Sequence, residues 1–424
     1  MRRFCRAGEG VERETEPMID FEPSEDQRMI QDSVAQFAKS TLAPRTRELE
    51  KLRGVPEDVR RLAHEMGIAL VALPEAAGGQ GQGLLTAVIL EEELGSADAG
   101  AAFGLPGPGA FGAAVVELGT PEQAAEILAD FGAADAHDKF GAVAFSEASP
   151  NKARAGFLTV AKKTDAGWSL SGKKAFVTNA GLADRFVVFA QVDEAAGWGG
   201  IGAFLVRGDN PGLKRGPRHT TLGLDAADFG EITLENAVVE ESARLAGDAG
   251  DGGFTKATLR YFAKQALVVA ARAVGLARFA FELAREYCET RQAFGKPIGH
   301  FQAVAFNLAD RHMDVESSRW LLWKAAHAWD SKAPDKYALR ATAQGVAFAL
   351  EAAMRTADDG VGLHGGSGFI RDVVAEKLMR DAKQLALCSP TAEQLDQLAT
   401  ALDLGIPLDP ALVLPTPDTQ AIFT

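Results

Sequence analysis

Cysteine is scarce in this chain, which holds only Cys5, Cys288 and Cys388. Thiols so few and so widely spaced exclude a disulfide-stapled scaffold, and no Cys/His spacing indicates a metal site. Intracellular proteins keep their thiols reduced, so the scarcity favours a reducing, cytoplasmic compartment. The sequence therefore predicts neither a disulfide-rich secreted domain nor a metalloprotein.

Long apolar runs, a signal peptide and an excess of positive charge are missing as well. No run of about 18 apolar residues occurs, so no membrane span is predicted. Residues 1–17 have no apolar core, which excludes a secretory signal and predicts a disordered extension; a translation start at Met18 stays open. Lys and Arg number 44 against 58 Asp and Glu, and the net charge of −14 argues against a nucleic-acid partner.

What remains is the composition of an ordinary globular protein. Hydrophobic residues make up 47% and charged residues 24% of the 424-residue chain. This length allows two or three domains with sizeable cores. The Gly-rich segment 73–83 lacks the Lys-Ser/Thr ending of a P-loop, so we do not interpret it as a nucleotide site.

Residues 18–135 form a first zone with helical periodicity. Ser24 and Gln27 have the spacing of a capping box at the start of a first helix. Further helices are predicted at 56–66 and at 85–95. The sequence therefore predicts an N-terminal helical domain.

Residues 136–245 alternate apolar and polar side chains between short turns, which predicts a small antiparallel β domain. Residues 246–400 return to helix-length periodicity with short loops, as in an antiparallel four-helix-type bundle. In this zone, helices are predicted over residues 258–290, 301–328 and 334–357. Residues 401–424 are rich in proline and predict an extended tail. The predicted fold class is α+β, mainly α.

Four long motifs follow one another along the chain. They are EPSEDQRMIQDSVAQFA, KKAFVTNAGLAD, ETRQAFGKPIGHFQAVAFNLADRHMDVESSRWL and GGSGFIRDVVAEKLMRDAK. Together, and in this order, they resemble the acyl-CoA dehydrogenase family over roughly residues 18–400. The resemblance implies an N-terminal helical domain, a central β domain and a C-terminal bundle, the order that the patterns predict.

The resemblance also implies FAD-dependent α,β-desaturation of an acyl-CoA or another acyl thioester, as in fatty acid metabolism. In that reaction a glutamate removes the α-proton and the β-hydrogen leaves as hydride, with the redox work done by the flavin. The thioester carbonyl must be polarised for a carboxylate to take a proton from carbon. A homodimer or homotetramer and electron-transferring flavoprotein as electron acceptor are further expectations.

Several FAD contacts carry over from the family residue by residue. Thr178 matches a hydroxyl beside the flavin ring, and Phe176 matches an aromatic side chain that covers it. Phe145 and Ser146 match the strand that faces the pyrimidine edge of the flavin. These four residues are therefore expected around the flavin ring.

A second set of expected FAD contacts lies in the bundle. Arg291 matches an arginine that reaches the FAD pyrophosphate of a neighbouring subunit. Phe294 and Gln302 match residues that hold the adenine half, and Gly365 and Gly366 match a turn where backbone approaches the cofactor. Without the resemblance, Arg291 fits a surface ion pair, Phe294 fits a core aromatic, and Gly365 and Gly366 fit a plain helix cap and turn.

The catalytic positions depart from the family. Aligned from MRDAK, Ser389 stands where most relatives have the catalytic glutamate, and a serine hydroxyl is too weak a base without a partner. Some relatives place the base on the first long bundle helix, and this position falls on Gln265. Glu393 is the nearest acidic residue downstream and a weak alternative. Cys388 is expected to be a packed thiol.

The substrate side departs as well. The family's Glu-Pro-x-x-Gly-Ser-Asp loop keeps Glu147 but loses its Gly-Ser-Asp, with Lys152 and Arg154 nearby. Asp225 replaces the arginine of a Gly-Leu-Arg segment. Asp98 is a further base candidate, although a surface or capping role suits it better. Two hypotheses stay open: an FAD enzyme on acyl thioesters with a non-standard base, and a catalytically degenerate member that serves as heteromer partner of an active paralogue or as a binding scaffold.

Overall fold

The computed structural model describes residues 22–245, 253–406 and 414. The helices are α1 (Glu25–Phe37), α2 (Thr46–Leu52), α3 (Glu57–Glu65), α4 (Gly83–Gly104), α5 (Gly109–Leu118), α6 (Pro121–Leu128), α7 (Gly253–Thr290), α8 (Gln302–Asp330), α9 (Asp335–Leu363), α10 (Ala375–Leu387) and α11 (Ala392–Leu404). The strands are β1 (Gly141–Ala144), β2 (Val160–Thr164), β3 (Gly167–Thr178), β4 (Arg185–Gln191), β5 (Ile201–Arg207), β6 (Leu213–Arg218), β7 (Phe229–Val239), β8 (Arg244–Leu245), β9 (Gln292–Ala293) and β10 (Lys296–Pro297).

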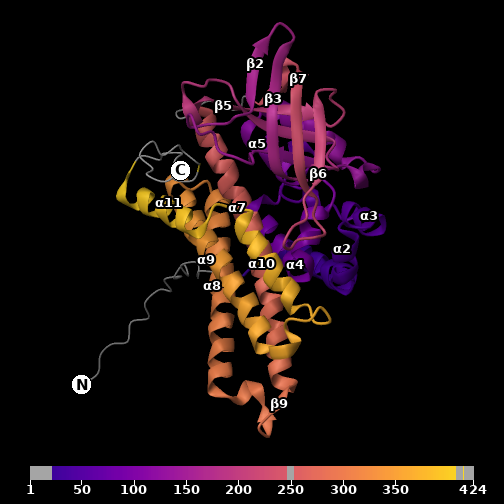
Figure 1. The fold of residues 1–424 in the computed structure, drawn as a ribbon, viewed down its shortest axis with the longest axis vertical. Helices are drawn as coiled ribbons and strands as arrows, with labels where there is room; N and C mark the ends of the chain where they lie inside the picture. The colour runs from indigo at the N-terminus through magenta and orange to yellow at the C-terminus, as the bar shows by residue number, and fades with distance from the viewer. Residues whose placement is uncertain (1–21, 246–252, 407–413, 415–424) are drawn as a thin grey trace, which may run out of the picture.

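Figure 1 shows three parts: a sheet at one end, a long bundle of α7 to α10, and the N-terminal helices packed beside both. This is the predicted class and order of α+β parts. The predicted extension 1–17 lies outside the described residues, as does most of the tail 401–424. Helix α11 runs to Leu404, so the first residues of that predicted tail are helical.

The N-terminal domain begins as its sequence predicts. The Ser24 hydroxyl accepts from the Gln27 backbone N–H at 3.2 Å, and the Gln27 side chain accepts from the Ser24 N–H at 2.9 Å, which confirms the capping box. Helix α4 is longer than predicted and is broken inside at Asp98, whose φ of −160° is not helical. The Asp98 carboxylate accepts from the Ala101 N–H at 2.9 Å, so the capping role is confirmed, whereas a surface role is wrong because Asp98 is buried.

The central sheet has the strand order β6-β7-β3-β2-β4-β5-β8, and β1 pairs with β4 outside this path. Most pairs are antiparallel, but β1 runs parallel to β4, with Gly141 opposite Arg185. Parallel neighbours need a long connection, and the chain between β1 and β4 supplies one. Alternating side chains show which residues share a face but not the direction of the partner strand, so the sequence did not predict this pair.

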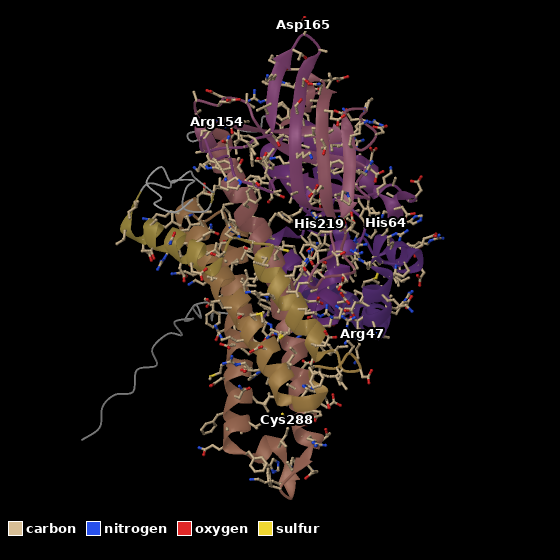
Figure 2. The ribbon with its side chains drawn as sticks, viewed as in Figure 1. Arg47, His64, Arg154, Asp165, His219 and Cys288 are labelled. Carbon is tan, nitrogen blue, oxygen red and sulfur yellow. The ribbon has the colours of Figure 1, made fainter. Side chains whose placement is uncertain are left out.

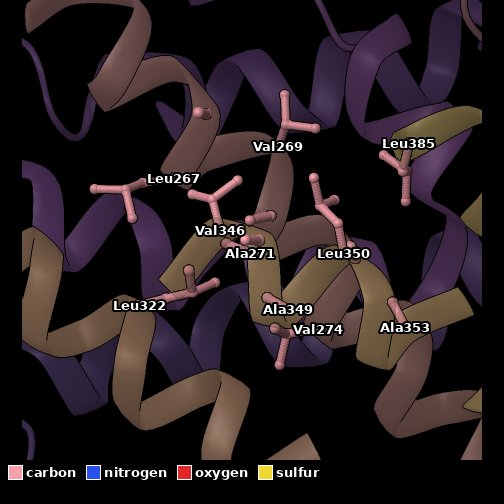
Figure 3. Packing of buried hydrophobic residues seen from close by; sticks show 14 of the residues in the cluster. Leu267, Val269, Ala271, Val274, Leu322, Val346, Ala349, Leu350, Ala353 and Leu385 are labelled. Atoms are coloured by element: carbon pink, nitrogen blue, oxygen red, sulfur yellow. The ribbon is translucent and has the colours of Figure 1, made fainter. Parts of the chain in front are cut away.

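The bundle core lies where α7, α9 and α8 meet, around Leu267, Val274, Leu322, Val346 and Leu350 (Figure 3). Helix α4 packs against α7 almost backbone to backbone. A Cβ added at Gly275 would lie 2.0 Å from the Glu92 carbonyl oxygen, so only glycine allows this approach. The contact fixes the N-terminal domain against the bundle. No helix in the described ranges is long and apolar enough to cross a membrane.

Candidate functional site

A cleft of about 1800 Å³ opens where the N-terminal helices, the sheet and the bundle meet. Residues of α4, α5, β1, β3, α7 and α11 line it, and most of them are apolar. Concave, largely apolar sites between domains are the usual place for cofactors and small ligands. His219, one of its lining residues, lies where the lower ends of the strands meet the helices (Figure 2).

Phe176 and Thr178 stand at the end of β3 on this cleft. The pairing of β3 with β7 shifts register between Lys174 and Val177, and Phe176 takes a left-handed φ of 56° in that irregularity. The bulge turns the Phe176 ring out of the sheet, where it is 62% exposed, with its centroid 5.3 Å from that of His219. A large aromatic face is thus presented to the cleft, as expected for a residue that covers a flat ring.

Phe145 and Ser146 follow β1 and also line the cleft. The Ser146 carbonyl accepts from the Ala175 N–H at 2.9 Å, and the Phe145 carbonyl accepts from Lys174 Nζ at 2.8 Å. These bonds hold the segment against β3, next to Phe176. The Phe145 side chain itself packs edge-on in an aromatic cluster, with centroid distances of 5.0, 5.1 and 4.5 Å to Phe157, Phe189 and Phe262.

Beneath this segment, Lys174 and Glu147 form a buried ion pair at 3.1 Å. Burial lowers the pKa of Lys174 to about 7, against the opposing effect of the Glu147 charge. The Lys174 ammonium in turn lowers the pKa of Glu147, despite the burial of that carboxylate. Glu147 also accepts from the N–H groups of Leu158 and Thr159 at 2.7 and 2.9 Å. The residue retained from the family loop is therefore a structural anchor below the site.

The two residues expected at the family's base positions both line the cleft. Ser389 follows α10, and Gln265 lies on α7; both line the cavity. Cys388, next to Ser389, is buried enough that the pKa of its thiol rises to about 11. Such a thiol is protonated near neutral pH, as expected of a packed side chain.

Glu393 points elsewhere. It lies in the first turn of α11, is exposed, and is not among the residues that line the cleft. Its own backbone N–H and the Thr391 hydroxyl lower its pKa, which weakens it as a base. Nothing in its position brings it to the bound substrate.

Three buried polar atoms that line the cleft have no hydrogen-bond partner among the described residues: Asn179 Oδ1, Ser389 Oγ and His219 Nε2, which lies 4.0 Å from Glu231 Oε1. Buried polar groups in proteins are nearly always paired, so such atoms on a cavity wall indicate a bound group. The sequence analysis missed Asn179 and His219. The available sequence signal was the position of Asn179 directly after Thr178 in the quoted motif. The structure adds that Asn179 has a left-handed φ of 61°. The polar groups at this edge fit a flat cofactor with its own donors and acceptors.

Four carboxylates also line the cleft, and each is already bonded. Glu91 pairs with Arg272, and Glu117 with Arg260 and Lys264. Asp330 accepts from the N–H groups of Leu84 and Leu85, and Asp335 pairs with Lys256 and Arg260. The sequence analysis singled out none of them, because each pair joins residues far apart in the chain. No group of three or more His, Cys, Asp or Glu able to hold a metal occurs among the described residues.

The second set of predicted FAD residues lies at the opposite end of the bundle from the sheet, near β9 (Figure 1). Arg291 directly follows α7 and lies 26 positions after Gln265, which corresponds to roughly 39 Å of helical rise. Phe294, with a left-handed φ of 50°, is 96% exposed beside a hollow of about 290 Å³. Arg291 and Gln302 are exposed as well. One dinucleotide does not bridge such a distance, so this tip and the cleft of the same chain do not hold the same cofactor.

Gly365 and Gly366 form the turn after α9 at this tip. Gly365 has a φ of 54°, and no atom lies within 4 Å of a Cβ added at either glycine. The space beside this turn is therefore open in the single chain. The structure brings Arg291, Phe294 and Gln302 to one end of the bundle, together with the two glycines.

Two of the three altered substrate-side charges have local partners. Lys152 is exposed and does not line the cleft, and Arg154 pairs with Glu194 at 3.4 Å. Asp225 pairs with Arg380 at 3.5 Å, beside a loop that lines the cleft. These contacts account for Arg154 and Asp225 without a ligand, and Lys152 remains an exposed charge outside the cleft.

Comparison with known proteins agrees with this arrangement in all three parts of the chain. The profile of the acyl-CoA dehydrogenase N-terminal domain matches residues 24–135. The profile of the middle domain matches residues 142–237, and that of the C-terminal domain matches residues 251–399. The three profiles follow one another in the order helices, sheet, bundle.

Individual relatives match along nearly the whole chain. The cyclohex-1-ene-1-carbonyl-CoA dehydrogenase of Geobacter metallireducens is 32% identical over 384 residues, which is 91% of this chain and 99% of the relative. The solved butyryl-CoA dehydrogenase of Megasphaera elsdenii superposes with a TM-score of 0.83 at 29% identity, over 91% of this chain and 100% of that one. The FAD complex of PigA superposes with a TM-score of 0.81 at 25% identity, over 92% and 100% of the two chains.

Proposed function

The chain belongs to the acyl-CoA dehydrogenase family, whose members are FAD flavoproteins, and from this premise we propose that it binds FAD and an acyl thioester in the cleft between sheet and bundle. The observation that carries the proposal is that Asn179 Oδ1, His219 Nε2 and Ser389 Oγ, which have no hydrogen-bond partner among the described residues, line the same cleft as Phe176 and Thr178. FAD accepts hydride in this family, so the protein's task is to orient the acyl group and to exclude water.

The residues around the cleft divide this task. When FAD is bound, Phe176 would cover its flavin ring, and Thr178 and the backbone of Phe145 and Ser146 would hold the ring through hydrogen bonds. The buried Lys174 fixes that backbone from below through its bond to the Phe145 carbonyl. The thioester occupies the space between this edge and Ser389. These roles follow from the family positions and from the lining of the cleft.

The proposed reaction uses a non-standard proton acceptor or none. Ser389 and Gln265 supply no carboxylate at the family's two base positions, and the four carboxylates of the cleft wall are held by cations or backbone N–H groups. Loss of a chain carboxylate as CO2 would leave the electron pair of the broken C–C bond on the acyl carbon, which then takes a proton from solvent, so that step would need no α-proton abstraction. Desaturation would instead need a base that is freed when substrate binds and accepts the α-proton.

We further propose that the tip of the bundle serves the FAD of a second chain, in a homodimer or homotetramer. Arg291, Phe294 and Gln302 are exposed there, far from the cleft of their own chain. A neighbouring chain that presents its cofactor to this tip would cover them. The electron acceptor would then be electron-transferring flavoprotein, as in the family.

A second candidate function keeps the fold but not the catalysis. Ser389 at the base position, together with fully paired cleft carboxylates, favours a degenerate member that acts as heteromer partner of an active paralogue or as a binding scaffold. This candidate predicts flavin or ligand binding without turnover.

The visible spectrum of the purified holoprotein, titrated with acyl-CoAs without oxygen, separates these functions. Bleaching of the flavin band by one acyl-CoA supports oxidation, and a shift without bleaching supports binding followed by another reaction or by none. Absence of a flavin band after incubation with FAD would contradict the flavoprotein proposal. A Ser389→Glu variant that gains bleaching would favour the degenerate candidate.

A further inference from the structure

Glu91 and Arg272 form a two-pronged ion pair in the wall of the cleft. Arg272 Nε and Nη2 donate to the two carboxylate oxygens of Glu91 at 2.6 and 2.8 Å. Both side chains line the cleft and are largely buried, with exposed fractions of 10% for Arg272 and 16% for Glu91. The pair thus places two charges on an otherwise mostly apolar wall.

The surroundings of Arg272 hold its guanidinium in place. The group lies 4.1 Å from the centroid of the Phe103 ring, which also lines the cleft. The backbones of α4 and α7 touch behind it, since a Cβ added at Gly95 would lie 2.3 Å from the Arg272 carbonyl oxygen. Cys388 and Ser389 line the same cleft as Arg272.

One nitrogen of this guanidinium has no partner. Nε and Nη2 bond to Glu91, and Nη1 donates to no group in the described part of the chain. Arg319, which pairs with Glu92 on the same helix α4 but lies outside the cleft, uses all three nitrogens, bonding to Glu92 and Glu316. On the same wall, the Ser389 hydroxyl is buried and unpaired.

Stability does not account for the Glu91–Arg272 pair. A buried ion pair is commonly no better for stability than apolar side chains of the same volume, because desolvation offsets the attraction. The position also needs no charge to join α4 to α7, since Glu92 and Glu93 already bond to Arg278 across that contact. A charge pair with a spare donor on the wall of a cavity suits the binding of a ligand oxygen.

We infer that Arg272, fixed by Glu91, determines substrate specificity by donating from Nη1 to an oxygen on the acyl chain beyond the thioester. Because Glu91 neutralises the guanidinium, the pair offers fixed N–H donors rather than a net charge, and a hydroxyl, carbonyl or carboxylate oxygen meets this need. The substrate class is therefore an oxygen-bearing acyl thioester rather than a plain alkyl one. The inference rests on the proposed binding of acyl thioesters in this cleft.

The test is an anaerobic titration of the holoprotein with matched CoA thioesters, followed through the flavin spectrum. At four, six and eight carbons, the plain acyl-CoA is compared with its terminal hydroxy, oxo and carboxy analogues. Hydrogen bonds to charged groups are worth enough to favour one oxygenated analogue by roughly tenfold to a hundredfold in Kd over the plain chain of equal length. Plain chains that bind as tightly as every oxygenated analogue would overturn the inference.

Two variants test whether the preference for an oxygenated acyl chain depends on Nη1 of Arg272. Arg272→Lys keeps a cation for Glu91 but has a single nitrogen, so the ratio of the two Kd values is expected to fall toward one. Arg278→Lys is the matched control, because Arg278 lies on the same helix, pairs with Glu93 at 2.6 Å and does not line the cleft. A ratio unchanged in Arg272→Lys, or lost equally in Arg278→Lys, would contradict the assignment.

A double variant tests whether the loss of preference comes from the lost donor rather than from misfolding. Glu91→Gln with Arg272→Gln removes both charges and leaves no unpaired ion, so this double variant is expected to fold and to lose the preference. If no acyl-CoA perturbs the flavin of the wild-type protein, the proposed function itself fails. If plain and oxygenated chains perturb it equally, only the inference about Arg272 fails.

Discussion

The two ends of the bundle differ in how much of a binding site one chain supplies at each end. At the cleft, residues of the sheet, α4 and α7 line a cavity together with the predicted flavin residues. Asn179 Oδ1, His219 Nε2 and Ser389 Oγ line the same cavity without a hydrogen-bond partner among the described residues. At the tip near β9, Arg291, Phe294 and Gln302 stand on an open surface. The cleft resembles a binding site within one chain, whereas the tip resembles half of a site.

This difference indicates where a second chain belongs. Helix α8 carries Phe306 and Met313 seven residues apart on one face, and they are 61% and 58% exposed. Phe369, near the glycine turn, is exposed as well. Apolar side chains gathered on one surface mark contacts with another protein. The tip and this face of α8 are therefore the expected interface between chains.

The largest effect is expected from charges placed on that face. Phe306→Asp with Met313→Asp would force two carboxylates into a contact between chains, and unpaired buried charges cost several kcal/mol each. We expect monomers and a loss of FAD of about a hundredfold or more in affinity, measured by light scattering and by the ratio of flavin to protein absorbance. Lys162→Asp on the exposed part of β2 is the control. An unchanged oligomer with full FAD content would contradict the assigned interface.

The next effect concerns the arginine at the tip. Arg291→Ala removes a charged donor for a phosphate, so FAD affinity is expected to fall by roughly tenfold to a hundredfold. Titration of the apoprotein with FAD measures this, with Lys296→Ala in the same hairpin as the matched control. Equal FAD affinities in the two variants would assign Arg291 a surface role instead.

The buried Lys174 predicts a pH dependence at the cleft. Burial lowers its pKa to about 7, so above that pH the folded chain has released a proton that the unfolded chain still holds. Relative to Lys174→Met, the free energy of unfolding of the wild type is therefore expected to rise by several kcal/mol between pH 7 and 10.

Urea unfolding at several pH values measures this change. Lys173→Met, an exposed neighbour on β3, is the control and should show a difference from wild type that does not vary with pH. A stability difference for Lys174→Met that is flat across this range would mean that Lys174 keeps its ordinary pKa.

The last prediction concerns the reactivity of Cys388 and leaves binding and stability unchanged. Its pKa of about 11 leaves little thiolate at pH 8, so alkylation by iodoacetamide should be about a hundredfold slower than for an ordinary exposed thiol. Mass spectrometry of the Cys388 peptide, with the denatured chain as reference, measures the rate. Rapid labelling of the folded protein would show a reactive rather than a packed thiol.

The sequence predicted the parts of the molecule that depend on local pattern. The capping box at Ser24, the long bundle helices and the motif around Thr178 follow from spacing along the chain. Spacing along the chain does not predict the break of α4 at Asp98 or the parallel pairing of β1 with β4, because tertiary contacts determine both. The pair of Glu91 and Arg272 joins two helices far apart in sequence, and no local signal marks it.

The central claim is that one FAD site needs the cleft of one chain and the tip of another. Co-expression of Arg291→Ala with a differently tagged Phe176→Asp chain tests it, since each variant alone lacks one half of every site. The account predicts little FAD in either variant alone and about one FAD per mixed dimer, because the intact cleft of the first chain meets the intact tip of the second. A mixed dimer that binds no more FAD than the separate variants would contradict the claim.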